Sequence, residues 1–165
     1  MEEYFSKLQT GDANAFEYIY NELKNPVYTI AYRIVQSKEL AEDVTQEVFL
    51  KLFAIPQNLA VKYPRAWVFQ MTHNAAIDAL RRERNAEDIE GISQCAAERD
   101  IAQQLDIEKA LAALPQTERE IVSLHLNAEL TFSEIADVTG LTLSSVYRRY
   151  RKALKILKKL LEVSL

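Results

Sequence analysis

The chain has 165 residues, of which 48% are hydrophobic, and its formal net charge is -4. This apolar content is sufficient for a folded core and excludes a disordered tail, and no stretch approaches the roughly 18 apolar residues of a membrane span. A lone cysteine, Cys95, excludes an internal disulfide and suits a reducing compartment. We therefore expect a cytoplasmic protein with no membrane insertion, and the three Gly and four Pro favour long helices.

The first 84 residues predict a domain of four helices without a strand. Asp12 is a suitable N-cap for the first helix, and Asn25-Pro26 predicts a break, with Pro26 in the first turn of the second. Ser37 is placed to cap the third helix, and Pro64 opens the fourth after a polar loop. Trp67 is expected in the core.

Residues 85–105 form an acidic linker in this interpretation. The wider segment 85–107 holds six acids and one base, and its apolar residues show no clear period. A short helix over 97–104 would shorten the reach of this flexible linker.

Residues 106–165 predict a second helical domain. Thr131 and Glu134 have the spacing of a capping box, and Gly140 stands where a helix end requires a left-handed residue. Thr142 then caps a longer helix. A short helix, a tight turn containing Gly and a second helix are typical of a helix-turn-helix.

The second helix of this motif is cationic. Residues 141–159 contain seven Lys or Arg and no Asp or Glu. An apolar stripe runs from Leu143 to Leu161, and the polar side chains off it suit phosphates and base edges: Ser144, Ser145, Tyr147, Arg148, Arg149, Arg151 and Lys152.

Two other interpretations of this helix are a solvated amphipathic helix and a membrane-surface helix. The first explains the late cations Lys155, Lys158 and Lys159, which favour the helix C-terminus. It does not explain Arg148 and Arg149, which stand in the first two turns, where cations are disfavoured. Nucleic-acid binding is therefore favoured.

The first domain contains two further polar patterns. Asp43, Gln46 and Glu47 share one helix face, which is either an ordinary solvated face or a surface for a basic protein partner. The helix after Pro64 mixes aromatic and basic residues, as single-stranded nucleic-acid sites do, although Asp78 and Arg82 could simply pair with each other.

Nothing in the sequence favours an enzyme. The two histidines, His73 and His125, fall in different predicted domains without nearby metal-ligand spacing, and no nucleotide-binding or nucleophile motif is present. We expect no catalytic residue, metal or cofactor.

Three ordered segments resemble the extracytoplasmic-function (ECF) sub-family of bacterial RNA polymerase sigma factors. LAEDVTQEVFLKLF is similar to region 2.2, and YPRAWVFQMTHNAAIDALRRER is similar to regions 2.3 and 2.4. ALAALPQTEREIVSLHLNAELTFSEIADVTGLTLSSVYRRYRKALKIL is similar to region 4. The resemblance runs from about Asp12 to Leu161, the linker aside.

This resemblance implies a factor that binds core RNA polymerase, through the β′ clamp and the β subunit, and promoter DNA. Asp43, Gln46 and Glu47 would contact the clamp. The −10 element would be bound by Tyr63, Asn74, Arg81 and Arg82, and the −35 element by the seven polar residues of the cationic helix. An anti-sigma factor is a further implied partner. A stand-alone helix-turn-helix regulator and a sigma mimic that sequesters an anti-sigma factor are the alternatives.

Overall fold

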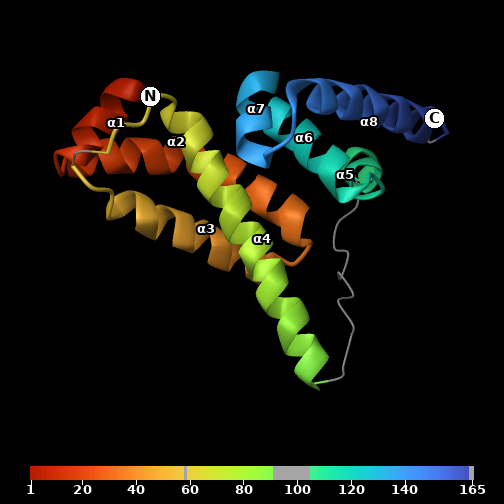
Figure 1. Cartoon of the computed structure of the whole chain (residues 1–165), viewed down its shortest axis with the longest axis horizontal. Helices are drawn as coiled ribbons and strands as arrows, with labels where there is room; N and C mark the ends of the chain where they lie inside the picture. The colour runs from red at the N-terminus through yellow and green to blue at the C-terminus, as the bar shows by residue number, and fades with distance from the viewer. Residues whose placement is uncertain (58, 91–104, 164–165) are drawn as a thin grey trace.

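The computed structural model describes residues 1–57, 59–90 and 105–163, which contain helices and turns and no β-strand. The N-terminal domain consists of α1 (Glu2–Gln9), α2 (Ala13–Val35), α3 (Lys38–Phe53) and α4 (Pro64–Glu90). The C-terminal domain consists of α5 (Leu105–Ala112), α6 (Gln116–Leu126), α7 (Phe132–Thr139) and α8 (Leu143–Val163). Figure 1 shows the two groups of helices, and the expected all-α, two-domain architecture is confirmed.

The predicted break at Asn25-Pro26 is wrong, because α2 runs through Pro26 without interruption. Proline lacks the N–H that would bond the preceding turn, a loss of about 3 kcal/mol in a helix interior. Leu23, Val27 and Ile30 lie on both sides of it and are 0% exposed. Burial of this continuous apolar stripe offsets the lost hydrogen bond and keeps the helix intact.

Helix α1 was not expected from the sequence. Its residues Phe5 and Leu8 are buried, and the Phe5 ring meets Trp67 edge-on with the ring centroids 5.6 Å apart. Trp67 therefore packs against the core, as predicted. The N-terminal domain keeps four helices, because α1 is gained where two predicted helices have merged into α2.

The helix-capping predictions are confirmed. Asp12 accepts hydrogen bonds from the backbone N–H groups of Asn14 and Ala15, and Ser37 accepts one from Leu40. Thr131 and Glu134 form the complete capping box, Gly140 has φ 69°, and Thr142 accepts from the N–H of Ser145. These contacts satisfy backbone donors that a helix start otherwise leaves unpaired.

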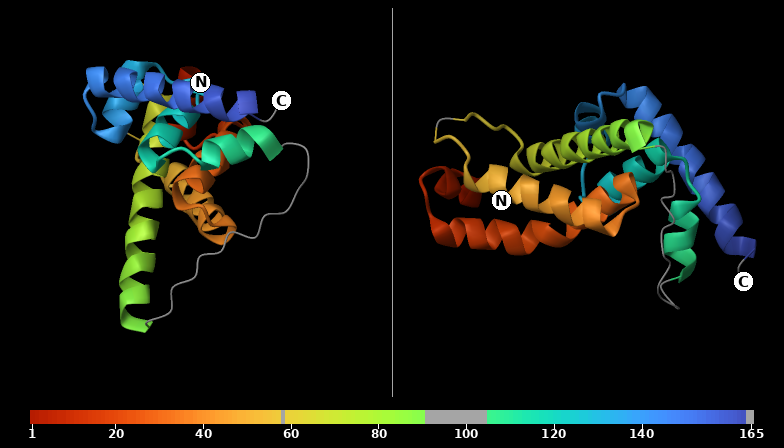
Figure 2. Two further views of the ribbon diagram at one scale, coloured as in Figure 1. Left: turned by 90° about the vertical axis from the view of Figure 1, so that its right-hand side faces the viewer. Right: turned by 90° about the horizontal axis from the view of Figure 1, so that it is seen from below.

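Helix α4 continues past residue 84, where the linker was expected to begin, as far as Glu90. No Pro or Gly interrupts the sequence before Gly91. The C-terminal half of α4 projects beyond the other helices (Figures 1 and 2). The predicted helix over 97–104 and Cys95 lie outside the described residues.

The two domains share one hydrophobic core. Ile19 and Leu23 of α2 belong to the same buried cluster as Ile121 and Leu124 of α6 and Ile135 of α7. Helix α6 packs against α2, and α7 packs against α4 (Figure 2). A smaller cluster joins α5, α6 and α8.

Buried polar contacts accompany this shared core. Arg33 of α2 is 7% exposed, and its guanidinium donates to Ser123 Oγ at 3.0 Å and to Glu108 Oε1 at 2.9 Å. Arg119 of α6 donates to the backbone oxygen of Arg33 at 2.9 Å. Arg65 Nε of α4 donates to the backbone oxygen of Ala128 at 2.7 Å. These directional contacts fix how the domains meet.

Candidate nucleic-acid and protein interfaces

The predicted acidic face lies on α3. Asp43 and Gln46 are exposed, whereas Glu47 is half-buried and accepts a hydrogen bond from Lys51 Nζ at 2.7 Å. Arg82 of α4 approaches the other Glu47 oxygen at 3.7 Å. The hydrogen bond from Lys51, together with the charge of Arg82, holds the pKa of Glu47 below its usual value. Glu47 thus already has partners within the chain, and Asp43 is the more open carboxylate.

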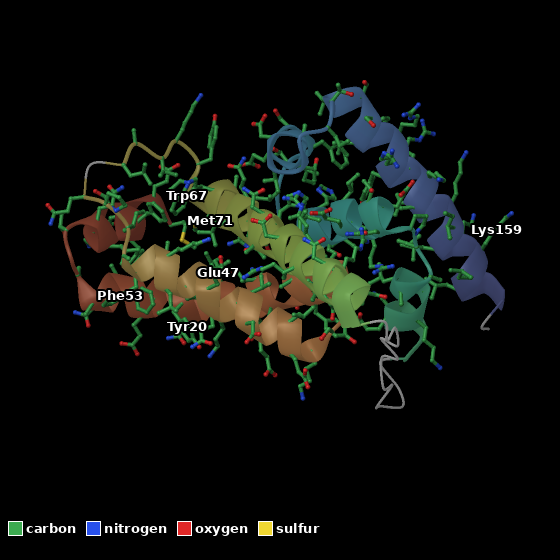
Figure 3. The ribbon with its side chains drawn as sticks, turned by 60° about the horizontal axis from the view of Figure 1, so that its bottom comes forward. Tyr20, Glu47, Phe53, Trp67, Met71 and Lys159 are labelled. Atoms are coloured by element: carbon green, nitrogen blue, oxygen red, sulfur yellow. The ribbon has the colours of Figure 1, made fainter. Side chains whose placement is uncertain are left out.

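An aromatic groove of about 500 Å³ adjoins this face between α2 and α3. Gln46 is part of its lining, and the C-terminal end of α3 contributes Leu50 and Phe53, which are 62% and 68% exposed. Figure 3 shows Tyr20 and Phe53 on this side of the domain, with Glu47 nearer α4. This groove was not predicted from the sequence, although Leu50 and Phe53 lie off the buried stripe of α3.

The predicted −10 residues lie on α4 and just before it. Tyr63 is 50% exposed, and Lys62 Nζ lies 5.1 Å from its ring centroid. Asn74 is exposed, as are Arg81 and Arg82, whose side chains are 71% and 68% exposed. All four predicted side chains are therefore open to solvent and come from one helix and its leading loop.

The suggested pairing of the Asp78 and Arg82 side chains is not found. Asp78 instead lies 3.7 Å from Arg81, and Arg82 donates to the backbone oxygen of Asp78. Arg82 also lies near Glu47 and so links α4 to α3.

Six of the seven predicted −35 residues on α8 fall into two sets in the structure, and the seventh, Ser145, is half-buried in the first turn. Val146 and Ala153 are 0% exposed and anchor the helix. We call the residues that share the open side the reading face: Ser144, Tyr147, Arg148 and Arg151, all exposed.

The second set consists of Arg149 and Lys152. Both contact the Glu118 carboxylate of α6, Arg149 Nη1 at 3.2 Å and Lys152 Nζ at 3.1 Å. Glu118 has a side chain that is 2% exposed. Burial alone would raise its pKa, but the hydrogen bond from Lys152 and the charge of Arg149 bring the pKa below its usual value. Glu118 is therefore a buried carboxylate that pairs with two cations of α8.

The outer part of the predicted apolar stripe of α8 is solvent-exposed. Leu143 is 54% exposed and Leu154 is 43% exposed, whereas Tyr150 is half-buried in the core. The C-terminal half of α8 carries Lys155, Lys158 and Lys159. Of these, Lys159 points away from the body of the protein (Figure 3).

The histidines have structural partners. His73 contacts Glu120 across the domain interface, and His125 Nδ1 lies 2.9 Å from the backbone oxygen of Leu130. Among the residues that the structure describes, no group of three or more potential ligands could hold a metal ion. No helix among them is long and apolar enough to cross a membrane.

Four polar residues that make contacts between helices were not predicted from the sequence: Arg33, Glu118, Arg119 and Glu120. Each of them has at least one partner far along the chain, and local spacing does not predict such a contact. Glu118 stands in the first turn of α6, where an acid is common for local reasons alone.

Comparisons with known proteins agree with this arrangement. Residues 19–86 match the model of sigma-70 region 2, and residues 104–157 match the model of sigma-70 region 4. The chain belongs to the sigma-70 family. Its N-terminal domain is sigma region 2 and its C-terminal domain is sigma region 4, so it directs RNA polymerase to promoters.

Curated relatives are ECF sigma factors, as the sequence resemblance predicted. The chain is 28% identical to the ECF RNA polymerase sigma factor SigK of Mycobacterium tuberculosis, over 93% of this chain and 89% of SigK. It is 29% identical to SigM of Bacillus subtilis, over 84% of this chain and 92% of SigM.

Solved structures share the fold. The sigma factor RpoE of Bartonella quintana, determined in complex with the anti-sigma factor NepR, superposes with a TM-score of 0.73 at 22% identity and covers 91% of this chain and 98% of its own. CnrH, determined with the cytosolic domain of CnrY, gives a TM-score of 0.66 at 21% identity, over 98% of this chain and 97% of its own.

Proposed function

We propose that this sigma factor divides its contacts by charge, with acids facing the polymerase and bases facing the promoter. The observation that supports this most directly is that α3 exposes the carboxylate of Asp43, whereas α4 and α8 expose several cations. The proposed division of the chain is residues 1–84 for region 2, 85–105 for an acidic linker and 106–165 for region 4.

The polymerase contact is assigned to Asp43, Gln46 and Glu47, which would meet a basic surface of the β′ clamp. Asp43 carries most of the charge complementarity, because Glu47 is already hydrogen-bonded to Lys51. The neighbouring groove offers Leu50 and Phe53 for apolar contact in the same interface.

The −10 element is assigned to Tyr63, Asn74, Arg81 and Arg82. An exposed aromatic ring can stack on an unpaired base, and the two arginines can bind the backbone of the opened strand. The −35 element is assigned to the polar residues of α8, which include the reading face. A helix of this kind reads base edges in the major groove.

Further partners follow the family. We propose that the linker passes through a basic channel of the polymerase, and that an anti-sigma factor covers these surfaces when transcription is not required. The chain would act in the cytoplasm without chemistry of its own, because it supplies recognition while the polymerase carries the catalytic site.

The test mixes the purified protein with core RNA polymerase and a promoter library, and the transcript starts are then sequenced. The proposal is supported if transcription starts at a defined set of promoters only when this protein is present. DNA binding without polymerase would instead favour a stand-alone regulator, and neither activity would favour a sigma mimic.

The polymerase face has its own test. Asp43→Lys reverses a charge in the proposed interface and should weaken binding to core polymerase, measured by fluorescence anisotropy. Glu17→Lys reverses an exposed charge on α2 and serves as the matched control. Equal loss in both variants would contradict the assignment of the face.

A further inference from the structure

We propose that Glu118 is a positioning residue for promoter recognition, which holds Arg149 and Lys152 against α6 and so sets the rotation of the reading face. This inference rests on the proposed −35 role of α8. It removes Arg149 and Lys152 from the set of direct DNA contacts and assigns discrimination to the reading face.

The burial of Glu118 supports this role. Its side chain is 2% exposed, and a buried carboxylate is costly unless it is paired. Its two cationic partners come from successive turns of α8, at 3.2 Å and 3.1 Å. A buried carboxylate that contacts two side chains of α8 restrains the rotation of that helix better than a single contact would.

Helix geometry places the two sets on different sides of α8. The reading face follows the spacing i, i+3, i+4, i+7, which lines one side of a helix. Val146 and Ala153 mark the buried side. Arg149 and Lys152 lie on the flank between these two sides, where their side chains extend toward α6 and not along the reading face.

A residue of the reading face also packs against the preceding helix, α7. The Tyr147 ring meets Phe132 of α7 edge-on, with the centroids 5.8 Å apart, and the Arg151 guanidinium lies 5.8 Å from the Tyr147 centroid. A planar guanidinium held over a ring loses less freedom when it bonds a base. Glu118 and Phe132 therefore fix α8 from two directions.

This arrangement also affects binding to DNA of any sequence. Two unpaired cations beside the groove would release counterions from phosphates regardless of base sequence. Because the single charge of Glu118 offsets one of the two and holds both side chains near α6, affinity depends more on the reading face. Replacing Glu118 should therefore lower discrimination between sequences without lowering affinity for unrelated DNA.

The experiment uses holoenzyme assembled from the full chain and core polymerase. The probes are two duplexes of one promoter found by start-site sequencing, one with its −35 element intact and one with that element scrambled. The ratio of the two affinities is the measured quantity. Thermal melting of each variant confirms that it is folded.

Glu118→Gln should lower this ratio about tenfold, the scale of a lost base contact, and leave affinity for the scrambled duplex unchanged or higher. Arg149→Met should lower the ratio in the wild-type background but add no further loss to Glu118→Gln. Arg148→Ala should add its own loss in both backgrounds. Arg149→Lys keeps a cation for Glu118 and should retain most of the ratio.

Two results would overturn the inference. One is an Arg149→Met loss as large in the Glu118→Gln background as in the wild type, because Arg149 would then contact DNA directly. The other is an Arg149→Lys loss equal to that of Arg149→Met. A wild-type holoenzyme that binds both duplexes equally would instead refute the −35 role itself, so the two failures are distinguishable.

Discussion

The His73 imidazole of α4 and the Glu120 carboxylate of α6 form a contact that joins the two sigma domains. Their side chains are 17% and 6% exposed, so the contact is largely shielded from water. Together with the Arg33 contacts it makes the domain interface dependent on charge as well as on apolar packing.

The His73 contact predicts a pH dependence. Burial alone would lower the pKa of His73, but the hydrogen bond and charge of Glu120 outweigh burial and raise the pKa above 6.5. The stabilisation is therefore complete below about pH 6.5, the unfolded value, and is lost as pH rises through the raised pKa. Thermal melting should show stability that falls over this range.

His73→Gln removes the titrating group and should flatten this part of the pH profile. The His125 ring remains in both proteins, so the difference between the profiles isolates His73. A wild-type stability that rose with pH across the same window would contradict the predicted sign.

Arg33→Met should loosen the contact between the domains. The variant keeps an apolar side chain but leaves Ser123 and Glu108 without the buried guanidinium, a loss of about 1–3 kcal/mol for such groups. Small-angle X-ray scattering should report a larger radius of gyration than in the wild type. Arg84→Met, at an exposed position of α4, is the matched control and should leave the radius unchanged.

Thr131→Ala should destabilise the start of the helix-turn-helix. The change removes the acceptor for the Glu134 N–H and one side of the capping box, which costs about 1 kcal/mol. The midpoint of urea unfolding should fall accordingly. Thr131→Ser retains the hydroxyl and should lie close to the wild type; an equal loss in both variants would show that the cap is not responsible.

Phe5→Ala should detach α1 from the domain. Phe5 is 3% exposed, and its truncation removes the ring that meets Trp67, at a cost of about 3–5 kcal/mol for a buried Phe. Trp67 is the single tryptophan of the chain, so its fluorescence should shift to the red as water reaches the ring. Phe5→Leu keeps most of the volume and should shift less; an unshifted Phe5→Ala spectrum would contradict this packing.

Local patterns were sufficient to predict the helices of the second domain. The caps at Thr131 and Thr142 and the left-handed Gly140 depend on residues within three or four positions of one another. Such short-range contacts form wherever the chain folds into a helix, so spacing alone identifies them. The same reasoning predicted that the cationic helix would expose Tyr147, Arg148 and Arg151.

Local patterns misled where packing outweighed propensity. Pro26 signalled a break, yet α2 continues because Leu23 and Val27 are buried on either side of it. Helix α1 was missed because its polar sequence conceals Phe5, whose partner Trp67 is distant in the chain.

The residue types of region 4 predicted a cationic DNA-binding helix. Only the tertiary structure showed which of its cations contact Glu118 and which face solvent. Arg149 and Arg148 are adjacent in sequence and indistinguishable by composition, but a rotation of about 100° per residue turns one toward Glu118 and leaves the other exposed. The carboxylate that separates them stands 31 residues before Arg149. Contacts over that distance depend on how α6 and α8 pack, which no local spacing specifies.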